Sequence, residues 1–222
     1  MTIPPNLSAL PPGFVVLRSA LDDVSLVLAD TAADAAWART DHSVLTEQEI
    51  NYSLEFDPEL ATTWAAGRVV LRHVLGSVLD CDPGSIEIRL DIAGKPRVTD
   101  CEFSVTRAQR LVLVAVAADP VGVDLEAIPE DSVAAEAAAL LHSRERDELA
   151  QLEGRELAES FVRVWARKEA FLKALSTGLA RDPGMDYIGA AGSPQSPHPD
   201  VDIVDVVNGI PAGYSAALAV NR

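Results

Sequence analysis

The sequence predicts an α+β protein built mainly on antiparallel sheet. Two strand candidates open the chain, a cluster of strand candidates follows a long helix, and further helices and a strand pair come last. Runs of strands followed by runs of helices are typical of this class, whereas a doubly wound parallel sheet alternates the two. Because Asp119-Pro120 lies near the midpoint, we expect an N-terminal half at 1–118 and a C-terminal half at 119–222, each long enough for a small α+β unit.

The N-terminal half combines β-branched strand candidates with Ala-rich helix candidates. Its expected elements are strands at 14–20 and 24–30, helices at 31–40, from Thr46 and at 58–80, strands at 85–91 and 101–105 around a turn at 93–98, and a strand at 111–117.

Two helix starts in this half carry clear signals. Thr46 followed by Glu49 forms a capping-box pattern. Asp57 is expected to cap the long helix, with Pro58 at its first position. Gly67 lies inside that helix and costs about 1 kcal/mol relative to alanine, so we expect close packing against another element there.

The C-terminal half is expected to begin with the strand that carries the most conspicuous acidic residues. Helices follow, then a Gly/Pro/Ser-rich segment typical of a mobile loop, and a closing hairpin. The expected elements are a strand at 121–126, helices at about 132–151 and 157–176, the loop at 189–200, and strands at 201–207 and 213–220.

Composition excludes several classes of protein. The formal net charge is −16, which argues against broad binding of nucleic acid or of a membrane surface, since both need a dense positive footprint. No window of 18 apolar residues predicts a membrane span, and the first residues lack the pattern of a secretory signal. The two cysteines form no disulfide framework, so we expect a cytoplasmic protein.

The basic residues are unevenly chosen. Only Lys95, Lys168 and Lys173 among the 18 basic residues are lysine, and they fall in two short segments. The ammonium of lysine is a compact point charge that suits phosphate contacts and proton transfer. This clue is compatible with chance placement, but it directs attention to the two segments.

In the strand at 121–126, alternation of side chains places Asp124 and Glu126 on one face. Two carboxylates this close repel each other unless they are solvated, protonated or neutralised by a cation. A hard divalent ion with oxygen ligands would neutralise them. A solvated sheet edge explains the strand equally well when it is considered alone.

The helix at 157–176 changes this balance. Its apolar stripe contains Lys168 at the centre, where a lone ammonium is costly to bury, so its partner is expected to be a buried acid or a phosphate. Glu169 and Lys173 are spaced i, i+4 on the flank of the stripe. Together with the two strand acids, these residues could bind a metal-bound diphosphate, with Lys173 neutralising charge on the leaving phosphate.

Several segments resemble the signature motifs of the surfactin-type 4'-phosphopantetheinyl transferases. VGVDLE at 121–126 is similar to the G-[IV]-D-[IVL]-E strand of that family, and WARKEAFLKALSTGL at 165–179 is similar to its W-x-x-K-E helix and the glycine that follows. AGKPRV at 93–98 resembles the G-K-P turn, and FSVTRAQRLVLVAVA at 103–117 resembles the F-[NS]-[IVL]-S-H-S strand pair. The order of blocks agrees from about residue 57 to residue 220.

The resemblance implies two similar α/β halves related by a pseudo-twofold axis, with coenzyme A and Mg²⁺ (or Mn²⁺) in the cleft between them. It implies that Asp124, Glu126 and Glu169 are metal ligands and that Glu169 is the base. It further implies that Lys173 contacts the phosphates and Lys168 supports the catalytic site. The nucleotide end would be bound by Lys95, Pro96, Thr106 and Arg107.

The implied reaction transfers the phosphopantetheine arm of coenzyme A to a serine of an apo acyl or peptidyl carrier protein and releases 3',5'-ADP. The implied enzyme is a cytoplasmic monomer that requires neither nucleic acid nor a membrane. Because the chain itself is acidic, a carrier that is also acidic would need a local basic patch for docking.

Two departures from the family pattern lie at the nucleotide end. Thr106-Arg107 replaces the usual Ser-His, and Thr63 stands where the family often has an arginine four residues before Gly67. Arg68 is expected to point elsewhere on the helix. An alternative is therefore a divergent relative that keeps the fold as a binding or regulatory protein and has lost its use of coenzyme A. An unrelated metal-dependent phosphoryl transferase is disfavoured, because the chain lacks a phosphate-binding G-x-x-x-x-G-K-[ST] loop.

Overall fold

The computed structural model describes residue 7 and residues 10–92, 94–177 and 181–222. Ala93 of the expected turn and Gly178 of the expected helix motif lie outside these residues, as does most of the N-terminal segment tested for a signal. The protein is a mixed α+β protein with two compact units. One comprises Met1–Cys101 with Val105–Ala118, and the other comprises Glu102–Ser104 with Asp119–Arg222.

The first unit contains a four-stranded sheet in the order β1-β2-β6-β5 and a small β3-β4 pair. The β1–β2, β2–β6 and β3–β4 pairs are antiparallel. The strands are β1 (Phe14–Leu17), β2 (Ser25–Asp30), β3 (Arg89–Leu90), β4 (Pro96–Arg97), β5 (Glu102–Ala108) and β6 (Leu111–Ala117). The helices are η2 (Ala36–Arg39), α1 (Glu47–Ser53), α2 (Pro58–Leu79) and η3 (Pro83–Ser85).

The predicted helix caps are confirmed. The hydroxyl of Thr46 accepts from the backbone N–H of Glu49, and the carboxylate of Glu49 accepts from the backbone N–H of Thr46. The carboxylate of Asp57 caps α2, with Pro58 at its first position. The buried face of α2 and the fully buried strand β6 supply much of the core of this unit.

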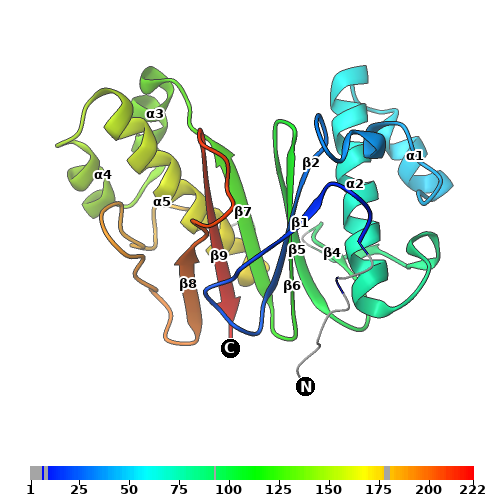
Figure 1. Cartoon of the computed structure of the whole chain (residues 1–222). Coiled ribbons are helices and arrows are strands. Elements are labelled where there is room, and N and C mark those ends of the chain that lie inside the picture. The colour runs from blue at the N-terminus through cyan, green and yellow to red at the C-terminus, as the bar shows by residue number, and fades with distance from the viewer. Residues whose placement is uncertain (1–6, 8–9, 93, 178–180) are drawn as a thin grey trace. The chain divides into compact units, whose positions relative to one another are not determined.

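The second unit has a three-stranded antiparallel sheet in the order β7-β9-β8. Its strands are β7 (Val121–Ala127), β8 (Val201–Asp205) and β9 (Tyr214–Asn221). Its helices are α3 (Asp131–Ala137), η4 (Ala138–Leu140), α4 (Ser143–Leu149) and α5 (Gly154–Ala174). Figure 1 shows α5 lying along the sheet, with α3 and α4 on the far side of the helix.

The long helix α5 is buried between two apolar clusters. One cluster joins α5 to β8 and β9 and includes Phe171, Leu172, Ile203 and Ala217. The other joins it to α3 and α4 and is centred on Phe161. A helix buried on two sides can present different residues to each neighbour, and this arrangement decides where its charged side chains point.

Three expectations about elements were wrong. Residues 31–40 form a turn and the short 3₁₀ helix η2 instead of a continuous helix. The helix expected at 132–151 is divided into α3, η4 and α4, because His142 begins a new helix with its own capping box. Only the end of the strand expected at 85–91 pairs, as β3.

Candidate active site

One face of β7 is turned toward α5, and it carries the two acids picked out from the sequence. A Cβ atom built on Gly122 would lie 2.0 Å from the carbonyl oxygen of Ala170, so the strand and the helix are in direct backbone contact there. Asp124 and Glu126 follow at alternate positions on the same face. The predicted alternation is confirmed, and Gly122 brings the helix close enough to reach the carboxylates.

Lys173 of α5 binds the first of these acids. Its ammonium nitrogen lies 2.6 Å from Oδ1 of Asp124 and donates to the backbone carbonyl of Val123 at 3.2 Å. The carboxylate of Asp124 is almost fully buried, whereas the side chain of Lys173 is 28% exposed. The ammonium is therefore anchored to β7, at the carboxylate of Asp124 and the carbonyl of Val123.

The other two acids have raised pKa values. Burial, together with the charges of Asp124 and Glu169, raises the pKa of Glu126 to about 7 against the opposing effect of Lys173. Burial also raises the pKa of Glu169, with a contribution from Asp124. The three predicted acids therefore lie within electrostatic reach of one another, and a bound cation would be stabilised among them.

The cluster is not a ready-made metal cage. Among the residues that the structure describes, no group of three or more histidine, cysteine, aspartate or glutamate side chains is arranged to hold a metal ion. A Mg²⁺ ion usually takes one or two carboxylates and fills its other positions with water and phosphate oxygens. The oxygen donors and the raised pKa values fit such an ion, provided that the carboxylates turn toward it.

Lys168 points to a different neighbour. It is 2% exposed, and its ammonium lies 2.8 Å from Oε2 of Glu145, which is fully buried. The sequence predicted either a buried acid or a phosphate as the partner of this lysine, and the structure shows a buried acid. Burial lowers the pKa of Lys168, and the hydrogen bond and charge of Glu145 counter that effect.

The predicted nucleotide-binding residues belong to the first unit. Lys95 directly precedes β4, and Pro96 is the first residue of that strand; the Asp91 side chain accepts from the backbone N–H of Lys95 at 2.9 Å. Thr106 is buried in β5, and Arg107 is exposed next to it. The structure therefore describes the nucleotide-end residues in one unit and the acids with Lys173 in the other.

Gly67 explains how Arg107 is held. A Cβ atom on Gly67 would lie 2.4 Å from Cδ of Arg107, so the arginine stem lies directly on the helix at the glycine. The close packing predicted at Gly67 is confirmed. Although Arg107 as a residue is exposed, the protein atoms around its guanidinium desolvate that group and lower its pKa. Because an arginine stays charged even so, its guanidinium is poised to gain from an anionic ligand.

Arg68 is the next arginine along α2. Its guanidinium lies over the ring of Trp64 at 5.2 Å and pairs with Glu49 at 3.4 Å. Within the described residues, its buried Nη1 has no hydrogen-bond partner. Desolvation lowers the pKa of Arg68, with smaller contributions from the charges of Arg72 and Arg107, and the charge of Glu49 opposes them.

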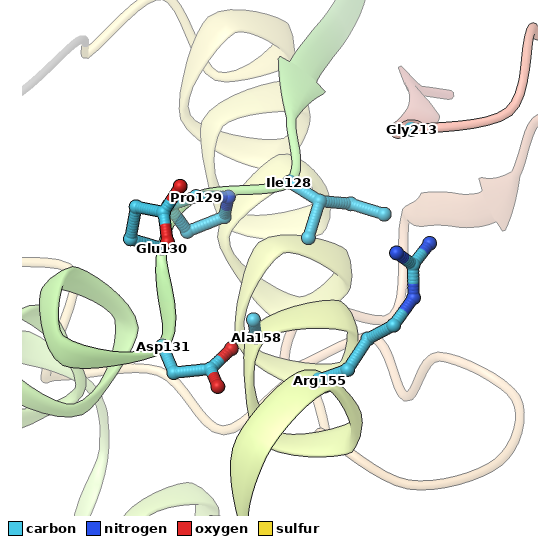
Figure 2. Close-up of a pocket in the computed structure, with 7 residues that line it drawn as sticks. All are labelled: Ile128, Pro129, Glu130, Asp131, Arg155, Ala158 and Gly213. Atoms are coloured by element: carbon cyan, nitrogen blue, oxygen red, sulfur yellow. The ribbon is translucent and has the colours of Figure 1, made fainter.

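A pocket of about 270 Å³ opens where β7 ends. Figure 2 shows that Ile128 and Pro129 form its upper wall, while Arg155 and Ala158 approach from α5. None of the residues predicted for the site lines this pocket, although it begins two residues after Glu126.

Sequence reasoning missed two residues that shape the site. The role of Gly122 is a steric one, and the only signal for it was a glycine inside a strand, which often marks a close backbone approach. Glu145 was not identified as the partner of Lys168. Its only signal was the capping-box spacing from His142. That spacing accounts for the glutamate as part of a helix cap, so it gives no indication of a second partner.

Comparisons with known proteins point to a single family. Residues 120–195 match the model of the 4'-phosphopantetheinyl transferase superfamily. The 4'-phosphopantetheinyl transferase HetI of Nostoc sp. is 30% identical over 203 residues, which cover 87% of this chain and 80% of HetI. The transferase gsp of Aneurinibacillus migulanus is 30% identical over 114 residues, and Sfp of Bacillus subtilis is 28% identical over 118. These matches cover 51% of this chain and 48% and 52% of gsp and Sfp, respectively.

Proposed function

The chain belongs to the 4'-phosphopantetheinyl transferase superfamily, and on that premise we propose how its residues carry out the transfer. The protein transfers the phosphopantetheine group to carrier proteins. In the proposed reaction, the serine hydroxyl of an apo acyl or peptidyl carrier attacks the β-phosphorus of coenzyme A. The new serine O–P bond replaces the P–O bond to the leaving 3',5'-ADP, and the serine proton passes to a base on the enzyme.

The observation that carries the proposal is the cluster formed by Asp124, Glu126, Glu169 and Lys173 between β7 and α5. The charges of Asp124 and Glu169 raise the pKa of Glu126, and that of Asp124 raises the pKa of Glu169, which supports a role in holding a divalent cation, Mg²⁺ or Mn²⁺. Asp124, Glu126 and Glu169 would hold this ion. When bound, it would supply a positive charge that polarises the diphosphate and stabilises the charge of the transition state.

Glu169 is the proposed base. Its carboxylate has a raised pKa, which suits a group that must accept a proton near neutral pH. It would take the serine proton directly or through one water molecule. Lys173 pairs with Asp124 and its side chain is partly exposed, so its positive charge would stabilise the phosphate that leaves with 3',5'-ADP.

The nucleotide end is proposed to be bound by Lys95, Pro96, Thr106 and Arg107 of the first unit. The best supported of these is Arg107, whose stem is fixed on Gly67 and whose guanidinium can make a fork contact with the 3'-phosphate. This contact would replace the one that the family pattern assigns to histidine. The pseudo-twofold relation of the halves and a site in the cleft between them remain predictions from the family resemblance, as do a monomeric state and a cytoplasmic location.

The experiment that tests the function uses purified protein, Mg²⁺, coenzyme A and an apo carrier protein. We expect the intact mass of the carrier to increase by that of the phosphopantetheine arm. We also expect no increase when the carrier serine is replaced by alanine. If several carriers remain unmodified where a control transferase works, and if calorimetry detects no binding of coenzyme A, the divergent binding protein becomes the better explanation.

A further inference from the structure

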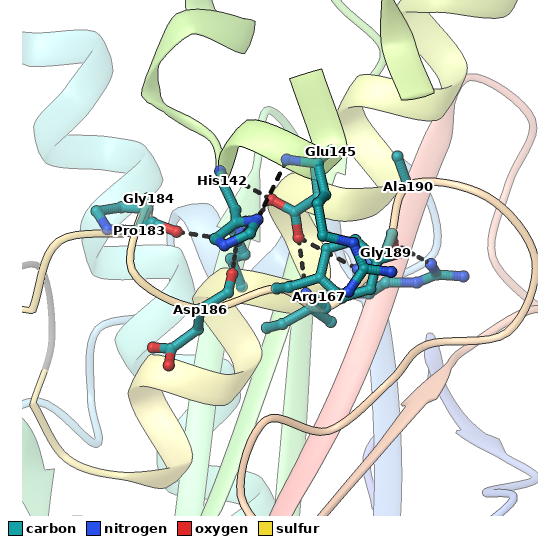
Figure 3. Close-up of polar contacts among 12 residues, drawn as sticks. His142, Glu145, Arg167, Pro183, Gly184, Asp186, Gly189 and Ala190 are labelled. Atoms are coloured by element: carbon teal, nitrogen blue, oxygen red, sulfur yellow. Dashed lines mark hydrogen bonds and ion pairs between the residues drawn. The ribbon is translucent and has the colours of Figure 1, made fainter. Parts of the chain in front are cut away.

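The segment between α5 and β8 is held by charged side chains although it contains neither helix nor strand from 181 to 200. Its first part is tied to the helices of the second unit. Lys168 donates to the backbone carbonyls of Pro183, at 2.9 Å, and Asp186. Figure 3 shows these contacts gathered around Glu145. The segment was expected to be mobile from residue 189, but its backbone is fixed as far as Gly192, whose carbonyl accepts from Arg167 at 2.7 Å.

Glu145 completes the network from α4. Its Oε1 accepts from the backbone N–H groups of Ile188 at 2.7 Å and Gly189 at 3.2 Å. Its Oε2 accepts from the backbone N–H of His142 at 3.0 Å and from Lys168. Both oxygens of this fully buried carboxylate thus have two partners each, which is the condition under which a buried charge is stable.

The ammonium of Lys168 is saturated as well. An ammonium has three N–H donors, and its three acceptors here are the carbonyls of Pro183 and Asp186 and the carboxylate of Glu145. No N–H remains for a phosphate. Although Lys168 is adjacent to Glu169 in the sequence, its head group is committed to acceptors of the protein itself.

The same network fixes the rotation of α5. Consecutive residues of a helix point about 100° apart, so Lys168 and Glu169 face different neighbours. Arg167 adds a second fixed point, since it forms a two-pronged contact with Asp205 at 2.7 and 2.6 Å and donates to the carbonyl of Gly189. A turn of α5 that moved Glu169 away from β7 would break these buried contacts.

We propose that the Glu145–Lys168 ion pair is a positioning device, which locks α5 so that Glu169 and Lys173 face the acids of β7. Lys168 then acts through Glu169 and does not touch coenzyme A. This inference rests on the proposed function for its effect on the reaction. It also has a structural consequence of its own, because the pair anchors the backbone of Ile188 and Gly189.

A double-mutant cycle with Lys168→Met and Glu145→Gln tests the proposal. Each single variant leaves a buried group without its partner, whereas the double variant leaves neither charge. We expect each single variant to lower kcat by about tenfold or more, to leave KM for coenzyme A within about twofold, and to raise the Mg²⁺ concentration needed for half-maximal rate. The double variant should recover much of the lost kcat.

A contact between Lys168 and the substrate predicts the opposite pattern. In that case Lys168→Met would raise KM for coenzyme A by about tenfold with little change in kcat, and adding Glu145→Gln would recover nothing. That result would overturn the proposal. Glu159→Gln is the matched control on the same helix, because it removes an exposed ion pair with Arg155 at 2.6 Å. We expect it to behave like the wild type.

Hydrogen exchange gives a readout that is independent of activity. In Glu145→Gln we expect the amides of Ile188 and Gly189 to exchange about tenfold faster than in wild type, while amides of β9 stay protected. This measurement can still be made if Lys168→Met fails to fold. It also tests the anchoring role of the ion pair separately from the proposed transfer reaction, because it applies even if the wild type transfers no phosphopantetheine. Unchanged exchange at both amides would show that the pair does not anchor the segment.

Discussion

Among the residues of the candidate site, Glu126 is the one whose charge is most strongly affected by its surroundings. It shares the face of β7 with Asp124 and approaches Glu169, so three carboxyl groups compete for one region with Lys173 as the opposing charge. Burial and the neighbouring charges raise its pKa to about 7. In the absence of a cation, the protonated form of Glu126 therefore persists to near neutral pH in the folded protein.

This shift predicts how stability depends on pH. The ordinary pKa of 4.5 applies to the unfolded chain, so between that value and about 7 the folded state binds more protons than the unfolded state. The contribution of Glu126 is thus greatest below pH 4.5 and is lost as the pH rises through 7. With the metal removed by a chelator, we expect thermal unfolding to show a smaller fall in Tm from pH 5 to pH 8 in Glu126→Gln than in wild type.

Glu159→Gln serves as the control, since the side chain of Glu159 is 43% exposed and lies in an ion pair with Arg155, so this variant should keep the wild-type slope. Added Mg²⁺ should raise the Tm of the wild type more at pH 8 than at pH 6, because the ion competes with protons for the same carboxylates. A wild-type Tm that rises steadily across this range would contradict the raised pKa of Glu126.

The arginine at the nucleotide end gives a second prediction at this scale. Arg107→Ala removes a charged phosphate contact, so we expect calorimetry to show coenzyme A binding weakened by about tenfold or more. Gly67→Ala should weaken it in the same direction, because the added methyl group displaces the stem of Arg107. Arg110→Ala is the matched control, since Arg110 is exposed and pairs with Asp30. Unchanged affinity in Arg107→Ala would remove Arg107 from the site.

At the scale of elements, the site depends on the contact between β7 and α5. Gly122 is the residue that permits it, since a methyl group there would also lie 2.5 Å from the backbone nitrogen of Ala174. Neither neighbour is the flexible end of a side chain, so the strand and the helix would have to separate. Asp124 and Glu126 lie on the same strand face and would lose their positions relative to α5.

We therefore predict that Gly122→Ala destabilises the protein by about 3 kcal/mol or more and abolishes transfer. Denaturant unfolding and the carrier mass assay would measure the two effects. Gly84→Ala is a suitable control, because its closest new neighbour is the side-chain carboxylate of Asp82 at 3.1 Å, which can move. A Gly122→Ala variant with wild-type stability and activity would show that the contact is looser than described.

Elements with strong local signals could be predicted from the sequence. The helices α1 and α2 begin where their caps indicate, and the strands β2, β6 and β7 follow their β-branched patterns. The Ala-rich stretch at 31–40 was misassigned because propensity alone favours a helix. In the structure, Asp30 binds the backbone N–H groups of Ala32 and Ala35, and these contacts hold the chain in turns.

The second misassigned helix has a similar cause. The composition of residues 132–151 suits one continuous helix, but the buried Leu141 and the cap at His142 divide it. The break places Glu145 near the start of α4, from which it reaches Lys168. Sequence reasoning could find the lysine, since a charge in an apolar stripe needs a partner. It could not identify Glu145, because the pairing depends on how α4 packs on α5.

At the scale of the whole molecule, charge affects the encounter with the carrier protein. The enzyme carries a net charge of −16, so an acidic carrier is repelled at long range. We expect kcat/KM for such a carrier to rise as NaCl is increased from about 10 to about 150 mM, because salt screens this repulsion. A carrier variant with its surface acids neutralised should show a smaller rise. A steep fall with salt would instead indicate a local basic docking patch.

The acids of the candidate site lay within reach of sequence reasoning because alternation on a strand and i, i+4 spacing on a helix fix which residues share a face. The central claim is that these three carboxylates of the second unit bind a divalent cation, and diffraction tests it most directly. A crystal grown with coenzyme A and Mn²⁺ should show an anomalous peak in contact with the carboxylates of Asp124, Glu126 and Glu169, with Lys173 on the diphosphate. Bound coenzyme A with its metal at other residues, or with no metal at all, would contradict the claim.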